Sequence, residues 1–458
     1  MSETGRRSAM RRTLSPTGVI AVVLPLLTVG ALALVRPDPA SIPAQGAQEV
    51  RPDRVDLVCP SALTEPLLAV AVAGAEVAGT ATAIPESGDA EPVEVEDDAV
   101  TRLSSPEVTE LRGEGDLASS LIAARVQERG LAATDCVLPR PDYWFSGVGA
   151  GAEHVSVLEL TNPDDGPAVA DVTVWARSGQ LDVPTLRGVI VPGGETLRLD
   201  LAQEVPRRTE LGISVVVSRG RLAATVEDEI PSLGARAATR GWLPESGEPA
   251  TEQLLLGLAA GEGSDTLVLT NPGADEARVE LRVVTQDASF VPEGLAEVRV
   301  GPMSVETVTL SEVLRRQVQE GALGLELSAT EPVSATLRSV VGEDLVHATR
   351  VAGSTNAMTA LVPPGEARLV LAGAEGSGIA QVTAYDADGR RLQRRRVELT
   401  DGSGGEVELR RGTALVRVSS KRTTVAAAVV VTGRGATVVP LEELVRRSLV
   451  PAVRPGLL

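Results

Sequence analysis

Apolar positions alternate with a period of two residues along most of this chain. Val172 and Val174, and later Val298 and Val300, each flank a single intervening position. Such alternation is typical of half-buried β-strands, because successive side chains of a strand point to opposite faces. Clusters of Asn, Pro, Asp and Gly interrupt these runs, for example at residues 162–166, and are typical of turns. The pattern therefore predicts an all-β body.

The alternating pattern is itself repeated. Residues 158–163 and 267–272 share the sequence Leu-x-Leu-Thr-Asn-Pro, and the later Ala-Thr pairs at 224–225 and 335–336 recur in the same order. A weaker third copy begins at residues 369–371 and lacks the Thr-Asn-Pro. The shared motif positions are Thr161, Asn162, Pro163, Thr270, Asn271 and Pro272. Because Asn can cap a strand end through its side chain and Pro stops further pairing, we interpret the motif as structural and not catalytic.

A repeat of roughly 100 residues with about seven short strands has the size of an immunoglobulin-like β-sandwich. The sequence therefore predicts tandem immunoglobulin-like sandwiches after one N-terminal transmembrane helix or signal peptide, with short helices at residues 117–128 and 311–316. The expected segments are a cytoplasmic basic tail (1–17), an apolar segment (18–35), a Pro-rich linker (36–56), an N-terminal β-rich domain (57–150), two sandwich repeats (151–245 and 255–352), a degenerate third repeat (360–440), and a short helix with a C-terminal tail (441–458).

The apolar segment Gly18–Val35 carries no charge and follows an arginine-rich stretch at residues 6–12. A basic flank before an apolar run keeps the N-terminus in the cytoplasm. A helix of this length spans about 27 Å, enough to cross the hydrocarbon core of a bilayer. We expect either a single-pass anchor in the plasma membrane with an extracytoplasmic body, or a secreted protein after cleavage near Ala33.

Composition narrows the range of partners. The chain has 458 residues, a net charge of −19 and only 2% aromatic residues. Binding of phosphate backbones requires clustered Lys or Arg, so an acidic body disfavours nucleic acid as a partner. The cores must be aliphatic, since the hydrophobic fraction of 43% contains so few rings.

The chain has two cysteines, Cys59 and Cys136. An even number of cysteines in an exported protein favours a disulfide, which here would close a long loop and stabilise the fold by about 3–5 kcal/mol. Two buried free thiols remain the alternative. No metal site is expected, because two isolated thiols cannot make a tetrahedral zinc site alone.

Few residues suggest catalysis. His154 and His347 are the two histidines, and neither has a neighbour at metal-ligand spacing, so both are expected to be structural or exposed. The glycine-rich residues 147–151 precede a strand and not a helix, which disfavours a phosphate site. No catalytic, cofactor-binding or metal-ligating residue is therefore assigned.

Three of the seven aromatic residues are consecutive, Tyr143, Trp144 and Phe145. They could form a contact platform for a ligand or a membrane. Alternatively, they pack as a plug between the cysteine-containing region and the first repeat.

The chain resembles an actinobacterial exported or membrane-anchored family of unknown function with Leu-Thr-Asn-Pro sandwich repeats. The resemblance covers most of residues 18–440 and rests on the basic N-terminus with one apolar span, Cys59-Pro60, Cys136 with the segment 143–147, and the repeated strand ends. It implies an envelope location and a β-sandwich body, and it supplies no activity or ligand.

These features together predict a non-enzymatic extracytoplasmic scaffold of the cell envelope that is structural or binds a partner. Two alternatives remain open. One is an accessory subunit of a membrane-bound envelope enzyme, and the other is a protein that binds or processes cell-wall glycan. The expected contacts are the plasma membrane through Gly18–Val35 and either an envelope protein or wall glycan.

Overall fold

The computed structural model describes residues 23–31, 48–50, 52–72, 74, 77–127, 131–232, 238–259, 263–295, 297–443 and 448–450. The chain divides into two compact units, a small one (Met1–Val50 with Leu449–Leu458) and a large one (Arg51–Ser448). In the small unit, residues 23–31 are helical and exposed, and strand β1 (Gln48–Val50) pairs with β36 (Ser448–Val450).

No helix among the residues described is both long and apolar enough to cross a membrane. The predicted segment Gly18–Val35 is only partly described, because residues 18–22 and 32–35 lie outside the described residues. The possible cleavage site near Ala33 falls among the latter.

The large unit consists of four β-sandwiches, which we name I to IV. Sandwich I contains β2 (Arg54–Cys59), β3 (Leu67–Val72), β4 (Gly79–Pro85), β5 (Glu91–Val95), β6 (Val100–Ser104), β7 (Thr109–Glu114), the 3-10 helix η1 (Gly115–Ser119), β8 (Leu121–Val126) and β9 (Ala133–Asp135). Sandwich II contains β10 (Asp142–Gly151), β11 (His154–Thr161), β12 (Ala168–Ala176), β13 (Gly179–Leu181), η2 (Pro184–Leu186), β14 (Val189–Val191), β15 (Thr196–Asp200), α2 (Leu201–Glu204), β16 (Arg208–Arg219), β17 (Ala223–Ile230) and β18 (Thr239–Leu243).

The other two sandwiches follow the same plan. Sandwich III contains β19 (Ala250–Leu256), β20 (Asp265–Asn271), β21 (Ala277–Val284), β22 (Ser289–Phe290), β23 (Val298–Val300), β24 (Ser304–Thr309), α3 (Ser311–Gln319), β25 (Gly324–Val341) and β26 (Asp344–Thr349). Sandwich IV contains β27 (Met358–Leu361), β28 (Glu366–Ala372), β29 (Gly378–Tyr385), β30 (Arg391–Leu399), β31 (Gly405–Glu408), β32 (Leu415–Lys421), β33 (Ala426–Thr432), β34 (Ala436–Pro440) and the added edge strand β35 (Glu442–Glu443).

All four sandwiches share one order of eight strands, with the short hairpin strands β13 and β22 and the edge strand β35 left out of the count. Sheet A holds the first, sixth, third and fourth strands in that order, as in β2-β7-β4-β5, and sheet B holds the fifth, second, seventh and eighth, as in β6-β3-β8-β9. In sandwich III the long β25 supplies both the sixth and the seventh strand, since its two halves pair with different sheets. An immunoglobulin domain instead places its first two strands side by side in one sheet. The expected immunoglobulin connectivity therefore does not describe these sandwiches, because alternation predicts strands and inward faces but not their pairing.

The repeated Leu-x-Leu segment is the second strand of each sandwich, and a fourth copy lies in sandwich I. Its two flanking residues point into the core, whereas the middle residue points out of the sandwich toward a neighbour. The middle residues are Ala69, Glu159, Val268 and Val370 in sandwiches I to IV. The repetition in the sequence indicates the copies in sandwiches II, III and IV but not the copy in β3 and β8 of sandwich I. In that copy, Ala123-Ala124 corresponds to Ala224-Thr225 of sandwich II.

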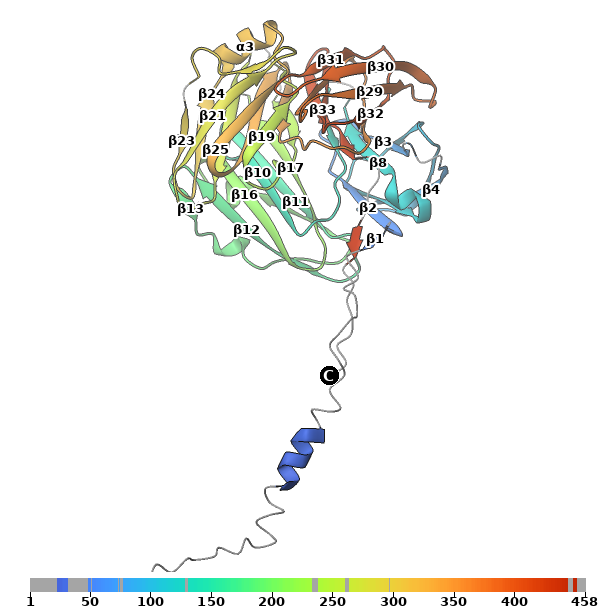
Figure 1. The fold of residues 1–458 in the computed structure, drawn as a ribbon, viewed down its shortest axis with the longest axis vertical. Coiled ribbons are helices and arrows are strands. Elements are labelled where there is room, and N and C mark those ends of the chain that lie inside the picture. The colour runs from blue at the N-terminus through green and yellow to red at the C-terminus, as the bar shows by residue number, and fades with distance from the viewer. Residues whose placement is uncertain are drawn as a thin grey trace, which may run out of the picture. The chain divides into compact units, whose positions relative to one another are not determined.

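Sheet A of each sandwich packs on sheet B of the next, and the fourth contact closes on the first sandwich (Figure 1). Val58 of I packs on Ala223 of II, and Trp175 of II packs on Val268 of III. The apolar clusters of the remaining contacts contain Leu256 with Val370 (III–IV) and Leu361 with Ala124 (IV–I). Four head-to-tail contacts of one kind make a ring when their rotation closes. The large unit is thus a closed ring and not an open string of tandem domains.

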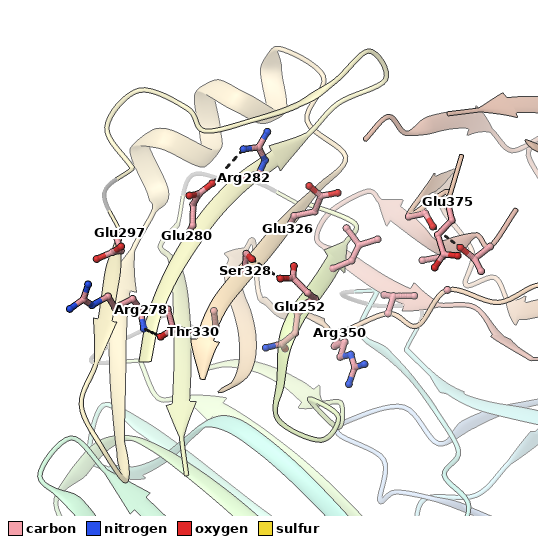
Figure 2. Close-up of a pocket in the computed structure, with 18 residues that line it drawn as sticks. Glu252, Arg278, Glu280, Arg282, Glu297, Glu326, Ser328, Thr330, Arg350 and Glu375 are labelled. Carbon is pink, nitrogen blue, oxygen red and sulfur yellow. Dashed lines mark hydrogen bonds and ion pairs between the residues drawn. The ribbon is translucent and has the colours of Figure 1, made fainter. Parts of the chain in front are cut away.

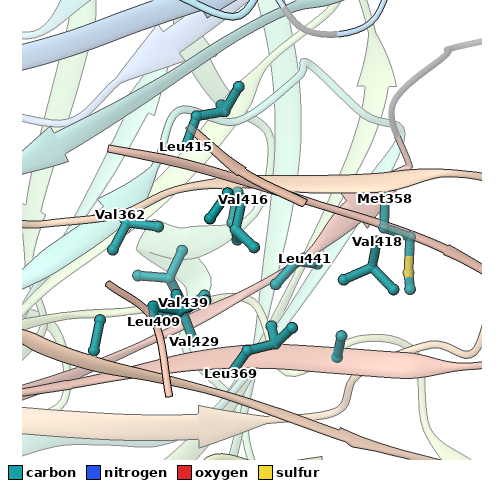
Figure 3. Packing of buried hydrophobic residues seen from close by; sticks show 14 of the residues in the cluster. Met358, Val362, Leu369, Leu409, Leu415, Val416, Val418, Val429, Val439 and Leu441 are labelled. Carbon is teal, nitrogen blue, oxygen red and sulfur yellow. The ribbon is translucent and has the colours of Figure 1, made fainter. Parts of the chain in front are cut away.

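The eighth strands meet in the middle of this ring. β9 contacts β18 and β34, and β26 contacts the same two strands. β18 and β26 also pair in parallel through Arg240 and Asp344, so sheets B of II and III become continuous. Each sandwich keeps its own aliphatic core, illustrated for sandwich IV by Leu369, Val418 and Val429 in Figure 3.

The expected disulfide is confirmed. Cys59 at the end of β2 is bonded to Cys136 just after β9, with the two Cα atoms 4.2 Å apart, so the bond joins the two sheets of sandwich I. Two predicted boundaries shift, because β2 begins at Arg54 inside the expected linker and β10 belongs to sandwich II.

The helix predictions had mixed outcomes. The predicted helix at 311–316 is confirmed as α3. The helix expected at 117–128 is wrong, since that region holds η1 and the buried strand β8. The helix expected from residue 441 is wrong for Glu442–Glu443, which pair with β27, and residues 444–447 lie outside the described residues.

Candidate functional site

The Thr-Asn-Pro motif is a structural turn in both copies. The Asn162 amide donates to the carbonyls of Gly166 (2.7 Å) and Val191 (3.1 Å), and its Oδ1 accepts the Asp164 N–H. Asn271 repeats this arrangement with Asp275, Val300 and Gly273. Both Asn side chains are buried, so they tie the second strand to the fourth and are not available to a ligand.

The aromatic run does not form a surface platform. Tyr143 and Phe145 lie in the core of sandwich II, where the Tyr143 hydroxyl donates to the carbonyls of Leu138 and Leu222. Trp144 is half-buried on the opposite face and stacks on Trp175 with ring centroids 5.1 Å apart, at the II–III interface. The packing interpretation fits this geometry, although the run packs toward sandwich III as well as toward the cysteine-containing region.

The two histidines, far apart in sequence, are brought together by one carboxylate. His154 Nε2 lies 2.7 Å from Asp228 Oδ1, and His347 Nε2 lies 3.1 Å from Asp228 Oδ2. All three side chains are buried at the II–III interface. Their other ring nitrogens face the backbone carbonyls of Thr209 (3.2 Å) and Trp242 (3.0 Å), so every ring nitrogen faces an acceptor.

A second ion pair completes this histidine cluster. Arg338 of sandwich III donates to Glu210 of sandwich II at 2.7 and 3.1 Å, and its Nη1 lies 3.0 and 3.2 Å from the two ring nitrogens of His154. Burial alone would lower the pKa of His154, but the adjacent Asp228 outweighs it and raises that pKa to about 9. Burial would likewise raise the pKa of Asp228, but the two histidines hold it well below its usual range.

The histidine cluster resembles a catalytic site but lacks its geometry. The Ser156 hydroxyl donates to Asp228 (2.5 Å) and accepts the Gly149 N–H, so its proton faces the carboxylate and not an imidazole base. Within the described part of the chain, no group of three or more His, Cys, Asp or Glu side chains is arranged to hold a metal ion. The cluster therefore joins two sandwiches.

A glycine marks this site in the sequence. A Cβ at Gly149 would lie 2.4 Å from His154 Cγ and 2.5 Å from the His154 carbonyl oxygen, so only glycine permits β10 to pass so close. The glycine-rich residues 147–151 therefore belong to a strand that accommodates the histidine.

A comparable charged cluster joins sandwiches I and II. The Glu159 carboxylate, buried in the middle of the Leu-x-Leu segment, accepts the backbone N–H (3.1 Å) and the hydroxyl of Ser61, and it pairs with Arg198. The buried Asp56 carboxylate accepts from Arg112 of its own sandwich and from Arg221 of sandwich II. These carboxylates are therefore already paired in the contact between sandwiches I and II.

A groove with a volume of about 750 Å³ lies between sandwiches III and IV. Its floor is the part of sheet A of sandwich III that sandwich IV does not cover, and Glu375 faces it from sandwich IV (Figure 2). The charged lining residues are Glu252, Glu280, Glu297, Glu326, Glu375, Arg278, Arg282 and Arg350. Carboxylates thus outnumber guanidinium groups, and none of the described residues that line the groove is aromatic.

The floor of the groove is an ordered ladder of polar side chains. Glu280, Ser328 and Glu252 lie opposite one another on three neighbouring strands. Glu252 accepts from the Ser328 hydroxyl at 2.6 Å, and Glu280 pairs with Arg282 at 3.4 Å (Figure 2). Such a flat, polar, strand-based floor suits an extended chain better than a compact apolar ligand.

Sequence reasoning assigned no residue to this groove. Its members come from β19, β21, β25, β33 and four loops, and their charges look like an ordinary solvated sheet face in the sequence. A second surface was also missed, the arginine-rich β30, although the run at residues 390–396 stands out in an acidic chain.

Comparison with known proteins identifies a family for this chain but no activity. No curated protein matches it. A family model described as a family of unknown function (DUF5719) matches residues 99–410, which covers sandwiches II and III completely and parts of I and IV. The chain therefore belongs to the DUF5719 family, whose function is unknown.

Proposed function

We propose that this protein is a non-enzymatic extracytoplasmic scaffold that binds a partner protein through the groove between sandwiches III and IV. The observation that carries the proposal is the groove itself, an open ladder of polar side chains between two sandwiches of a closed ring. Retention at the plasma membrane through Gly18–Val35 is part of the same proposal. It rests on the uncharged segment and its basic flank.

The chemistry of the groove favours a peptide with basic residues. Five glutamates against three arginines give the lining an excess of negative charge. Wall glycan is a weaker candidate, because sugar rings stack on aromatic side chains and none lines the groove. An enzyme is also disfavoured, since the buried histidine cluster has no nucleophile facing a base.

Photo-crosslinking in cells tests the proposal. A crosslinking amino acid at Thr330, on the groove floor, is expected to capture one defined polypeptide, whereas the same amino acid at the exposed Asp182 of sandwich II is not. The double reversal Glu280→Arg and Glu375→Arg should abolish this crosslink, because it reverses one charge on the groove floor and one charge that faces the floor from sandwich IV.

The matched control is Asp165→Arg with Glu195→Arg, which makes the same change in net charge on the surface of sandwich II. If the control abolishes the crosslink equally, or if the groove variant retains it, the groove is not the binding site. Recovery of glycan alone at Thr330 would favour the glycan-binding alternative.

A further inference from the structure

The fourth strand of sandwich IV differs from its counterparts in length and charge. β30 has nine residues, whereas β5 has five and β14 and β23 have three each. It carries Arg391, Arg394, Arg395 and Arg396, all exposed, in a chain whose net charge is −19. We name these four residues the basic edge.

The guanidinium groups of the basic edge are not neutralised. Within the described ranges, none of the four forms an ion pair with a carboxylate. The residues opposite Arg394, Arg395 and Arg396 on β29 are Thr383, Val382 and Gln381, which carry no charge. By contrast, Arg112, Arg198, Arg221 and Arg338 are each tied to a carboxylate between two sandwiches or within one.

The outer margin of β30 is paired with no further strand among those described, although the Arg410 side chain donates to the Leu392 carbonyl at 2.8 Å. Among the strands described, β30 lies at the end of its sheet and pairs only with β29 (Figure 1). An edge strand presents N–H and C=O groups that can pair with another strand, and nine residues extend over roughly 30 Å. Charged residues on an edge can simply prevent aggregation, but the counterparts β5 and β14 carry no basic residue and β23 carries only Arg299.

We propose that the basic edge is a second docking surface, which binds an extended acidic segment of a partner protein as an added β-strand. Arg394 and Arg396 point to one face of the sheet and Arg395 to the other, because side chains alternate along a strand. An added strand with consecutive acidic residues therefore meets an arginine on both faces, while its backbone pairs with β30. The free strand margin favours a peptide over a polyanion that has no peptide backbone.

Fluorescence anisotropy on the full-length protein tests this proposal. The probe is a labelled peptide with a run of consecutive Glu residues flanked by Val and Thr. Arg394→Glu with Arg396→Glu is expected to weaken its binding about tenfold or more, because two exposed charge pairs become repulsive. The control Arg187→Glu with Arg299→Glu, at the edges of sandwiches II and III, makes the same charge change and should leave binding unaltered.

Two further probes make the test decisive. A peptide with Lys in place of Glu should bind the reversed variant better than the wild type, which shows that the variant is folded and that charge pairing is direct. A peptide of equal charge with proline at alternate positions should bind at least about tenfold more weakly than the strand-forming peptide, because proline cannot donate to a ladder.

Three results would overturn the proposal. The first is unchanged affinity in the reversed variant. The second is binding of the proline peptide or inorganic polyphosphate as tight as that of the strand-forming peptide, which would indicate a general polyanion site. The third is self-association of the protein that the reversal removes, which would assign the edge to a second copy. The groove variant Glu280→Arg with Glu375→Arg should bind the acidic peptide normally, so the two surfaces can fail independently.

Discussion

The II–III interface buries charged and polar side chains, whereas the III–IV interface buries mostly aliphatic ones. The first holds His154, Asp228, His347 and Arg338, and the second holds Leu256, Val284, Val370, Ala428 and Val430. Both lie between successive sandwiches of the ring. In II–III the histidines and Asp228 belong to sheets B of the two sandwiches, whereas in III–IV Leu256 of sheet A packs on Val370 of sheet B. The same ring therefore contains one interface with buried charged side chains and another with mostly aliphatic side chains.

This difference determines which properties of the side chains the stability of each interface depends on. A buried charge is favourable only when all of its partners are present, so the II–III interface requires an intact set of residues. An aliphatic contact depends on volume and tolerates exchange between residues of similar size. The four predictions that follow test this contrast.

Replacing the shared carboxylate should have the largest effect. Asp228→Asn keeps the shape but removes the charge that both histidines face, so we expect a loss of about 3–5 kcal/mol in the free energy of unfolding. Chemical denaturation monitored by tryptophan fluorescence can measure it, because Trp144 and Trp175 stack at this interface.

Asp182→Asn is the matched control for this prediction. Asp182 is exposed and pairs with Arg187, which is also exposed, so its replacement should change stability by less than about 0.5 kcal/mol. If Asp228→Asn costs less than about 1 kcal/mol, the two interfaces do not differ in the way argued above.

On the aliphatic side, truncation should matter and shape-conserving exchange should not. Leu256 is fully buried between sandwiches III and IV, so Leu256→Ala should cost about 3 kcal/mol. Leu256→Met retains the volume and should cost less than about 1.5 kcal/mol. Denaturation midpoints of both variants check this. A Met variant as unstable as the Ala variant would mean that this interface also demands one shape.

Much of the architecture could be predicted from alternation and repetition. The all-β body, the disulfide and the helix α3 follow from local patterns, because the faces of a strand and the positions of turns depend on residues that are close in sequence. The strand order could not be predicted, since short loops allow consecutive strands to pair within a sheet or to cross between sheets. The copy in sandwich I was also missed, because its second strand has Ala69 where the others have Glu or Val.

The candidate sites were harder to predict for the same reason. His154 and Asp228 lie on the paired strands β11 and β17 of sandwich II, and His347 of β26 reaches Asp228 only because sandwich III packs against sandwich II. In hindsight, the middle residue of the Leu-x-Leu segment reflects the contact next to it: Glu159 lies in the charged I–II contact, whereas Val268 packs on Trp175 in the apolar part of the II–III interface. A charged residue at an otherwise apolar repeat position is thus a signal of a polar interface.

The polar interface should weaken as the pH rises. His154 has a folded-state pKa of about 9, above the ordinary 6.5, so its contribution is complete below about pH 6.5 and is lost as the pH passes 9. We expect stability to fall by up to about 3 kcal/mol over that range. His154→Gln should be less stable at pH 6 but should lack this decline. Denaturation at pH 6, 8 and 10 in constant salt compares the two proteins, and a parallel decline in both would assign it to other groups.

The aliphatic interface contains its own titratable group, with an earlier pH window. Burial raises the pKa of Asp344 to about 7, despite the Ala436 N–H that its carboxylate accepts from sandwich IV at 3.1 Å. The folded state therefore holds this proton more tightly than the unfolded state, and stability is lost as the pH rises from about 4 through 7. Above pH 7 a buried charge remains with one neutral donor.

Asp344→Asn keeps an acceptor for Ala436 and removes that charge. We expect it to stabilise the protein by about 1–2 kcal/mol at pH 8 and to have little effect at pH 4. Thermal unfolding at the two pH values measures the difference, with Glu343→Gln as the control, since this exposed neighbour raises the pKa of Asp344 only by charge repulsion. A loss of stability at pH 8 would show that the ionised carboxylate is favourable where it lies. In that case the III–IV interface, like the II–III interface, would depend on a buried charge.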